Sequence, residues 1–214
     1  MAEKTDITMD DARALVADKA LWPIVRDFLF CDFALQIHES WLESGGVKAE
    51  CPESVRVKTW ILGKLGVEPC FHVFPKDDWS RLLLLDGQTL ESLAKWLGAL
   101  VCAEPLRRVT GGAAVRELKS ALPGVYPEVF GYTMYFGGAK AENASVEDSG
   151  SVIRAGCRML LSFVEGVPEP LLRRLALKLP QSWPISVPPS FVPPSFNLPL
   201  LLKLRFPEAY SLCC

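Results

Sequence analysis

The residues best suited to chemistry in this sequence are two histidines and seven cysteines. Cys70 and His72 stand two residues apart, a spacing that could pair a thiolate with an imidazole. A zinc site normally takes two such closely spaced couples, and no second couple follows, so a packed or surface histidine is favoured over a metal ligand. An enzyme that acts through His38 or His72 with a cysteine is retained as one hypothesis.

A pair of arginines is the next candidate. Arg107 and Arg108 follow an apolar stripe and precede Gly111-Gly112. Arginines and the free amides of a helix N-terminus both favour anions, so the stretch could hold a phosphate. A two-glycine turn between helices explains the same letters without a ligand. Trp96 lies at the edge of the preceding leucine stripe, and Trp and Arg are favoured at protein interfaces, so a partner-binding role is the third possibility.

Composition narrows the function classes. No nucleophile elbow, P-loop, dinucleotide fingerprint or zinc-protease motif occurs. Lys+Arg number 23 and Asp+Glu number 25, without a long run of like charge, which argues against nucleic acid as the main partner. No apolar window reaches the roughly 18 residues of a membrane span, and the acidic N-terminus is unlike a signal peptide. We therefore expect a cytoplasmic protein with reduced thiols.

The cysteines lack the regular spacing of a disulfide framework. The terminal pair Cys213-Cys214 resembles a prenylated tail but has no basic cluster directly before it, so disordered terminal thiols are expected there. The remaining five lie singly in apolar or helical stretches, where Cys acts as a small hydrophobe: Cys31, Cys51, Cys70, Cys102 and Cys157.

The N-terminal part predicts helices separated by prolines. Thr8 and Asp11 approximate a capping box that opens the first helix. Residues 52–65 look like a further helix, with Pro52 in its first turn. Residues 67–75 contain two prolines, Pro69 and Pro75, with several β-formers between them, which predicts an extended connection.

The clearest predicted helix begins after Asp86. Glu91 and Lys95 form an i, i+4 pair on its polar side. Pro105 is expected to end or kink it, and Thr110 to cap the next helix. Its apolar stripe has the period of one helical face: Leu90, Leu93, Ala94, Leu97, Leu100 and Val101.

The later part combines a helix, a polar loop and a proline-rich tail. We expect a mobile surface loop at about residues 140–147 and a long helix over about residues 148–165. Leu175, Leu177 and Leu179 alternate, which predicts a helix turning into a strand. The repeat Val-Pro-Pro-Ser-Phe over residues 187–196 favours polyproline II: a spacer, a docking arm or a wrap against the helices.

Together these patterns predict a mainly α protein. Residues 1–180 are expected to form a single compact helical domain of about six to eight helices with short extended segments. Residues 181–214 are expected to form a Pro-rich C-terminal segment that is extended or packed on that domain.

Three stretches resemble one protein family. "LAKWLGALVCAEPLRRV" looks like the Leu-Gly and Arg-Arg segment of the SctK (YscK) family, accessory proteins of the sorting platform of bacterial type III secretion systems. "IRAGCRMLLSFVEGVPEPLLRRLALKLP" is similar to the family's late helix and basic, leucine-alternating stretch. "FLFCDFALQIHESWL" resembles its aromatic, histidine-containing element. The resemblance covers most of residues 28 to 180.

The resemblance implies a non-enzymatic adaptor at the cytoplasmic face of the bacterial inner membrane. Its partners would be the forkhead-associated cytoplasmic domain of an SctD-like inner-membrane ring protein and an SctQ-like pod scaffold protein. The chain would be a monomer alone, without a cofactor, and would reach the membrane only through its partners. The residues expected to contact a partner, or else to pair with Asp or Glu inside the domain, are Trp96, Arg107, Arg108, Arg173 and Arg174. A secretion chaperone or regulator that binds an export substrate in a hydrophobic groove is the alternative.

Overall fold

A computed structural model gives the fold of residues 8–46, 53–75, 79–136, 148–183 and 196–214. The described residues contain twelve α-helices, two 3-10 segments and no strand, which confirms the mainly α prediction. The helices are shorter and more numerous than expected, because prolines and glycines interrupt the chain often. The predicted loop at residues 140–147, the residues 187–195 of the repeat, Cys51 and the side chain of Cys31 lie outside the description.

The chain forms two units, and each is discontinuous in sequence. Unit 1 comprises residues 1–87, 166–181 and 211–214, and unit 2 comprises residues 88–165 and 182–210. The expected division at residue 180 stays a prediction.

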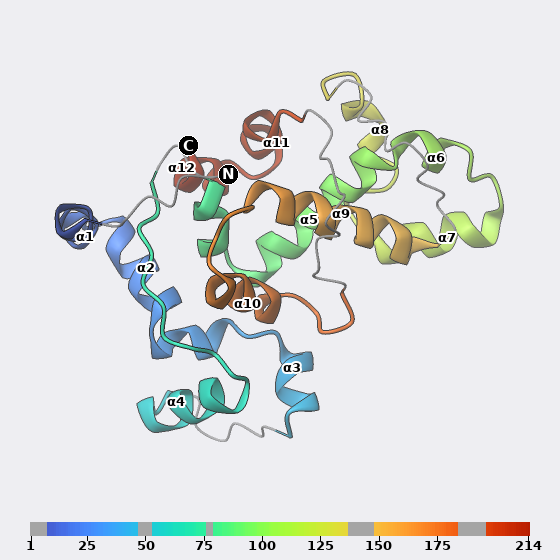
Figure 1. Ribbon diagram of the computed structural model, residues 1–214. Coiled ribbons are helices and arrows are strands. Elements are labelled where there is room, and N and C mark those ends of the chain that lie inside the picture. The colour runs from blue at the N-terminus through green and yellow to red at the C-terminus, as the bar shows by residue number, and fades with distance from the viewer. Residues whose placement is uncertain (1–7, 47–52, 76–78, 137–147, 184–195) are drawn as a thin grey trace. The chain divides into compact units, whose positions relative to one another are not determined.

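Unit 1 is built around helix α10. In Figure 1 the blue and cyan N-terminal elements and the orange α10 belong to this unit. Phe28 contacts Phe33 and Phe74 edge to face, with ring centroids 5.6 and 6.1 Å apart, and all three rings are buried. The elements are α1 (Met9–Ala17), α2 (Leu21–Leu29), η1 (Cys31–Gln36), α3 (Glu39–Ser44), α4 (Val55–Lys64), η2 (Trp79–Leu84) and α10 (Glu169–Lys178).

Unit 2 is organised by the crossing of α5 and α9. The elements are α5 (Gly87–Val101), whose first residue is counted with unit 1, α6 (Ala103–Arg107), α7 (Gly112–Ala121), α8 (Val129–Tyr132), α9 (Ser149–Phe163) and α11 (Leu198–Arg205). Helix α12 (Pro207–Cys213) runs from unit 2 into unit 1. All six apolar residues of the predicted α5 stripe are buried. Lys95 Nζ lies 2.6 Å from Glu91 Oε1, as their spacing predicted.

Two glycines allow α5 and α9 to approach closely. A Cβ on Gly98 would collide with the carbonyl oxygen of Val152, and a Cβ on Gly156 would collide with that of Ala94. Backbone therefore lies against backbone at this crossing, which only a residue without a side chain permits.

Several helix boundaries differ from the expectation. The first helix has the predicted capping box, with Thr8 Oγ1 accepting from the Asp11 amide. Helix α4 begins at Val55 rather than Pro52, after Ser54. The cap of α7 is Gly111, not Thr110. Pro105 lies in the first turn of α6, where an amide has no intrahelical acceptor.

The C-terminal part holds the main corrections. Helix α10 runs to Lys178, so the strand predicted from the alternating leucines was wrong. Leu179, the residue after the helix, has an extended backbone. Helices α11 and α12 were missed. Cys213 lies buried in α12 rather than in a disordered tail, and burial raises its thiol pKa to about 12. Cys214 is exposed.

Candidate partner-binding surfaces

Arg107 and Arg108 lie at the end of α6 and share one carboxylate. Arg107 Nη1 is 3.7 Å from Glu104 Oε2, and Arg108 Nη2 is 3.1 Å from Glu104 Oε1. The three side chains are 48%, 78% and 62% exposed, respectively for Arg107, Arg108 and Glu104. One carboxylate faces two guanidinium groups, so this surface keeps an excess of positive charge. Ion pairs this exposed contribute only about 0–1 kcal/mol to stability.

Arg107 is also held by α8. Its Nη2 donates to Thr133 Oγ1 at 2.6 Å, and its guanidinium carbon lies 5.8 Å from the centroid of the Phe130 ring. Thr133 in turn donates to the Phe130 carbonyl oxygen at 2.9 Å. These contacts restrict the Arg107 side chain, which lowers the entropy lost when it binds a partner.

Two apolar side chains follow α8 without cover. Met134 is 79% exposed and Tyr135 is 59% exposed, and they directly follow Thr133, the residue that binds Arg107. Met, Tyr and Arg are enriched at protein interfaces. We call Arg107, Arg108, Met134 and Tyr135 the α6–α8 surface. The sequence signal for Met134 and Tyr135 is the aromatic run "YTMYFGG" that contains them.

Trp96 is not on this surface. It is 3% exposed, and its ring meets Tyr132 edge to face at 5.2 Å between centroids. The Arg205 guanidinium lies 4.4 Å from the Trp96 ring, and Arg205 binds Tyr132 Oη at 3.2 Å and Glu128 Oε2 at 3.2 Å. Trp96 thus packs α5, α8 and α11 together within unit 2.

Arg173 and Arg174 of α10 lie in different environments within unit 1. Arg173 is exposed, its guanidinium carbon lies 5.3 Å from the Trp41 ring, and it donates to Leu65 O at 3.3 Å. Arg174 is 2% exposed and donates to Phe28 O and Glu68 O, each at 3.0 Å. Burial lowers the pKa of Arg174.

Lys178, one turn after Arg174, is a third cation of this helix and was missed. It is 1% exposed, and its ammonium donates to Leu83 O at 2.9 Å and Leu85 O at 2.7 Å. Burial lowers its pKa to about 7, against a smaller opposing effect of Asp86. The sequence signal for Lys178 is its position four residues after Arg174. In a continuous helix this spacing places the two side chains on the same face.

The three α10 cations bind carbonyls at the ends of other helices. Phe28 lies in the last turn of α2, Leu65 caps α4, and Leu83 lies in the last turn of η2. Carbonyls there lack intrahelical donors, and the helix dipole favours positive charge beside them. The buried Arg174 is therefore a structural cap, not a surface for a partner, whereas contact by Arg173 stays a prediction.

The histidines have ordinary surroundings. His38 Nδ1 accepts from the Ser40 amide at 3.2 Å and caps α3. The His72 ring meets Phe74 at 4.9 Å between centroids. The described ranges contain no group of three or more His, Cys, Asp or Glu placed to hold a metal ion.

A comparison with known protein families matches one region of the chain. Residues 25–128 match the family described as YOP proteins translocation protein K (YscK). This region is a YscK-family region. It covers just under half of the chain and includes η1, α3 to α7 and the Arg107-Arg108 pair. Searches of curated proteins and of solved structures gave no match.

The YscK match confirms the resemblance to the SctK (YscK) family, whose members are type III secretion proteins. The family is one of secretion apparatus components and is not a known enzyme family. None of the helices described is both long and apolar enough to span a membrane.

Proposed function

We propose that this protein is a non-enzymatic adaptor of the type III secretion sorting platform. It links the forkhead-associated cytoplasmic domain of an SctD-like inner-membrane ring protein to an SctQ-like pod scaffold protein. It works at the cytoplasmic face of the inner membrane, which it reaches through these partners. The YscK match over residues 25–128 is the observation that carries the proposal.

The α6–α8 surface supports an adaptor role because it combines charge with exposed apolar area. Arg107 is preorganised by Thr133 and Phe130, whereas Arg108 is 78% exposed and pairs with Glu104. Met134 and Tyr135 supply apolar area beside them. An acidic protein surface with an apolar centre fits these side chains, since carboxylates meet guanidinium groups with directional hydrogen bonds.

Charge reversal tests the proposal. Purified ring-protein domain and purified pod scaffold protein are each titrated against the protein and against the double variant Arg107→Glu, Arg108→Glu, by biolayer interferometry. We expect the variant to lose at least about tenfold affinity for one of the two partners, because repulsion replaces two charge-assisted contacts.

The control carries the same charge change elsewhere in unit 2. The double variant Arg116→Glu, Lys119→Glu alters two exposed cations of α7, and we expect it to bind like the unchanged protein. Circular dichroism checks that both variants are folded. If the unchanged protein binds neither partner, the adaptor proposal is wrong and the chaperone alternative is tested next with export substrates.

A further inference from the structure

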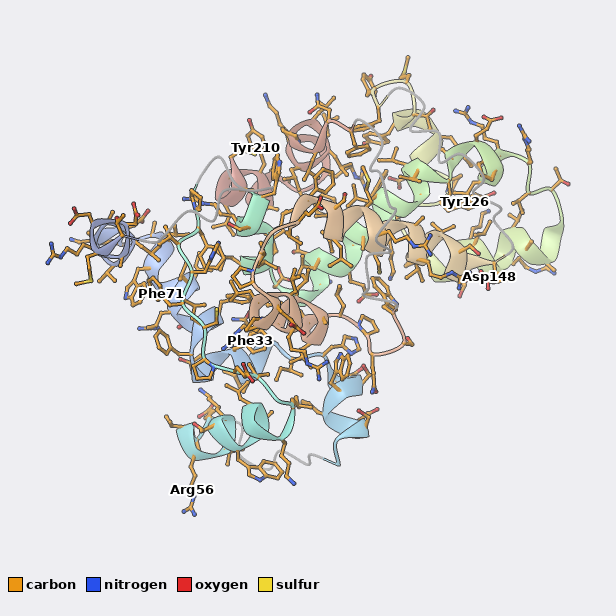
Figure 2. The ribbon with its side chains drawn as sticks, viewed as in Figure 1. Phe33, Arg56, Phe71, Tyr126, Asp148 and Tyr210 are labelled. Atoms are coloured by element: carbon orange, nitrogen blue, oxygen red, sulfur yellow. The ribbon has the colours of Figure 1, made fainter. Side chains whose placement is uncertain are left out.

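Helix α4 carries a basic and aromatic ridge on its outer side. Arg56, Trp60 and Lys64 are spaced four residues apart, so they are neighbours along one helix face. All three are exposed, Trp60 at 49%. The Lys64 ammonium lies 5.9 Å from the Trp60 ring centroid. Figure 2 shows Arg56 pointing away from the α4 ribbon. We call these three residues the α4 ridge.

The side of α4 that packs within unit 1 is a different one. Ile61 and Leu65 are buried there, and Lys58 Nζ binds Asp32 Oδ1 of η1 at 2.5 Å. These contacts hold α4 in place without the α4 ridge. Exposure of about half of a Trp side chain leaves apolar area in water that burial would stabilise.

The two cations of the α4 ridge are open to a partner. In the part of the chain that the structure describes, neither Arg56 nor Lys64 forms an ion pair. Their charges are therefore not compensated within unit 1 as the charge of Lys58 is. The chemistry that complements them is a pair of carboxylates, and the chemistry that complements Trp60 is an aliphatic side chain.

A protein surface fits the α4 ridge better than a lipid surface. Recognition of an anionic membrane usually takes a cluster of about four to eight basic residues. The α4 ridge offers two. Trp and Arg, in contrast, are the side chains that most often dominate the binding energy of protein interfaces.

We infer that the α4 ridge binds an acidic surface of another protein of the secretion apparatus, with carboxylates on Arg56 and Lys64 and an aliphatic side chain on Trp60. The inference rests on the proposed adaptor function, because a bridging protein needs a second surface besides the α6–α8 surface. The two surfaces belong to different units of the chain.

The test uses the full chain and two ridge variants. Arg56→Glu, Lys64→Glu reverses the charges, and Trp60→Ala removes the aromatic area. The ring-protein domain and the pod scaffold protein are titrated against each at low salt and at about 0.3 M salt, where surface charges are strongly screened. We expect about tenfold weaker binding of one partner by each variant, and a smaller salt effect on binding after charge reversal.

The matched control is Arg13→Glu, Lys19→Glu, which makes the same charge change at two exposed cations elsewhere in unit 1. We expect it to bind normally. Normal binding by both ridge variants would refute the inference while leaving the adaptor proposal intact. If the unchanged protein binds neither partner, both the adaptor proposal and this inference are wrong.

A vesicle-binding experiment tests the remaining alternative, in which the α4 ridge binds a lipid surface. Vesicles of phosphatidylethanolamine and phosphatidylglycerol are sedimented with the protein and with the charge-reversed ridge variant. Equal sedimentation of the two supports the protein partner. Ridge-dependent sedimentation without any ridge-dependent protein binding would overturn the inference in favour of a lipid surface.

Discussion

At the scale of single residues, unit 1 buries the basic side chains of Arg174 and Lys178, which donate hydrogen bonds to main-chain carbonyls. Arg174 also lies over the ring of Phe33, and Lys178 lies over the ring of Phe28. Figure 2 labels Phe33 in this region. Arg and Lys are mostly surface residues, so the sequence predicted for Arg174 either a contact with a partner or a pair with Asp or Glu inside the domain. Its partners, the carbonyls of Phe28 and Glu68, lie more than 100 residues away in the sequence and are brought to Arg174 only by folding.

Lys178 gives stability a pH dependence. Its pKa is about 7 in the native state and 10.5 ordinarily, so between these values the unfolded chain binds a proton that the native protein lacks. Its contribution to the free energy of unfolding should therefore rise as pH increases from about 7 toward about 10. Urea unfolding of the protein and of Lys178→Met should show a stability difference that shifts in favour of Lys178 over this range. A difference that is constant with pH would contradict the assignment.

At the scale of elements, the α5–α9 crossing depends on two glycines. The leucine stripe of α5 was predictable, because an apolar period of 3.6 residues is written in the sequence. The close approach was not predictable, since Gly98 and Gly156 matter only through the carbonyls of Val152 and Ala94 on the facing helix. The end of α10 illustrates the same limit, because alternating leucines are compatible with a helix that is buried on several sides.

Alanine substitution should distinguish these glycines from exposed ones. Gly98→Ala and Gly156→Ala should each lower the free energy of unfolding by about 1–3 kcal/mol, because the new Cβ forces the helices apart. Gly63→Ala in α4 should raise it by about 0.5–1 kcal/mol, since nothing lies within 4 Å of the added carbon and Ala favours helix. Urea titration measures all three, and a loss at Gly63 equal to that at Gly98 would contradict the packing argument.

At the scale of the whole molecule, the grouping of segments is the least predictable feature. The sequence predicts a helical domain up to residue 180, followed by a Pro-rich segment that is extended or packed on that domain, and the proline content suggested the boundary. In the structure, residues 166–181 and 211–214 belong with the N-terminal part. Long-range hydrogen bonds make this association, as in Arg81 Nη1 donating to Leu212 O at 3.1 Å. No local sequence pattern predicts hydrogen bonds between residues so far apart in the chain.

Helix α10 caps several helices of unit 1. We therefore expect a destabilising substitution in α10 to lower the local stability of unit 1 and to leave that of unit 2 unchanged. Arg174→Met removes donors from Phe28 O, which is buried, and from Glu68 O, which is part-buried. Leaving the buried acceptor unsatisfied costs about 1–3 kcal/mol. Hydrogen exchange followed by mass spectrometry should then show faster exchange in α2 and α10. The amides of α5 and α9 should exchange at unchanged rates. Equal acceleration in both units would show that they unfold as one.

The interleaving of the two units also bears on how the chain folds. Residues 88–165 enter between two parts of unit 1, so Phe28 and Arg174 must find each other across 146 positions of chain. Closing a long flexible loop costs entropy that grows with the logarithm of its length, and distant contacts slow folding. An inserted segment that folds early through its own α5–α9 crossing replaces that flexible loop with a rigid span, and the search left to unit 1 becomes correspondingly shorter.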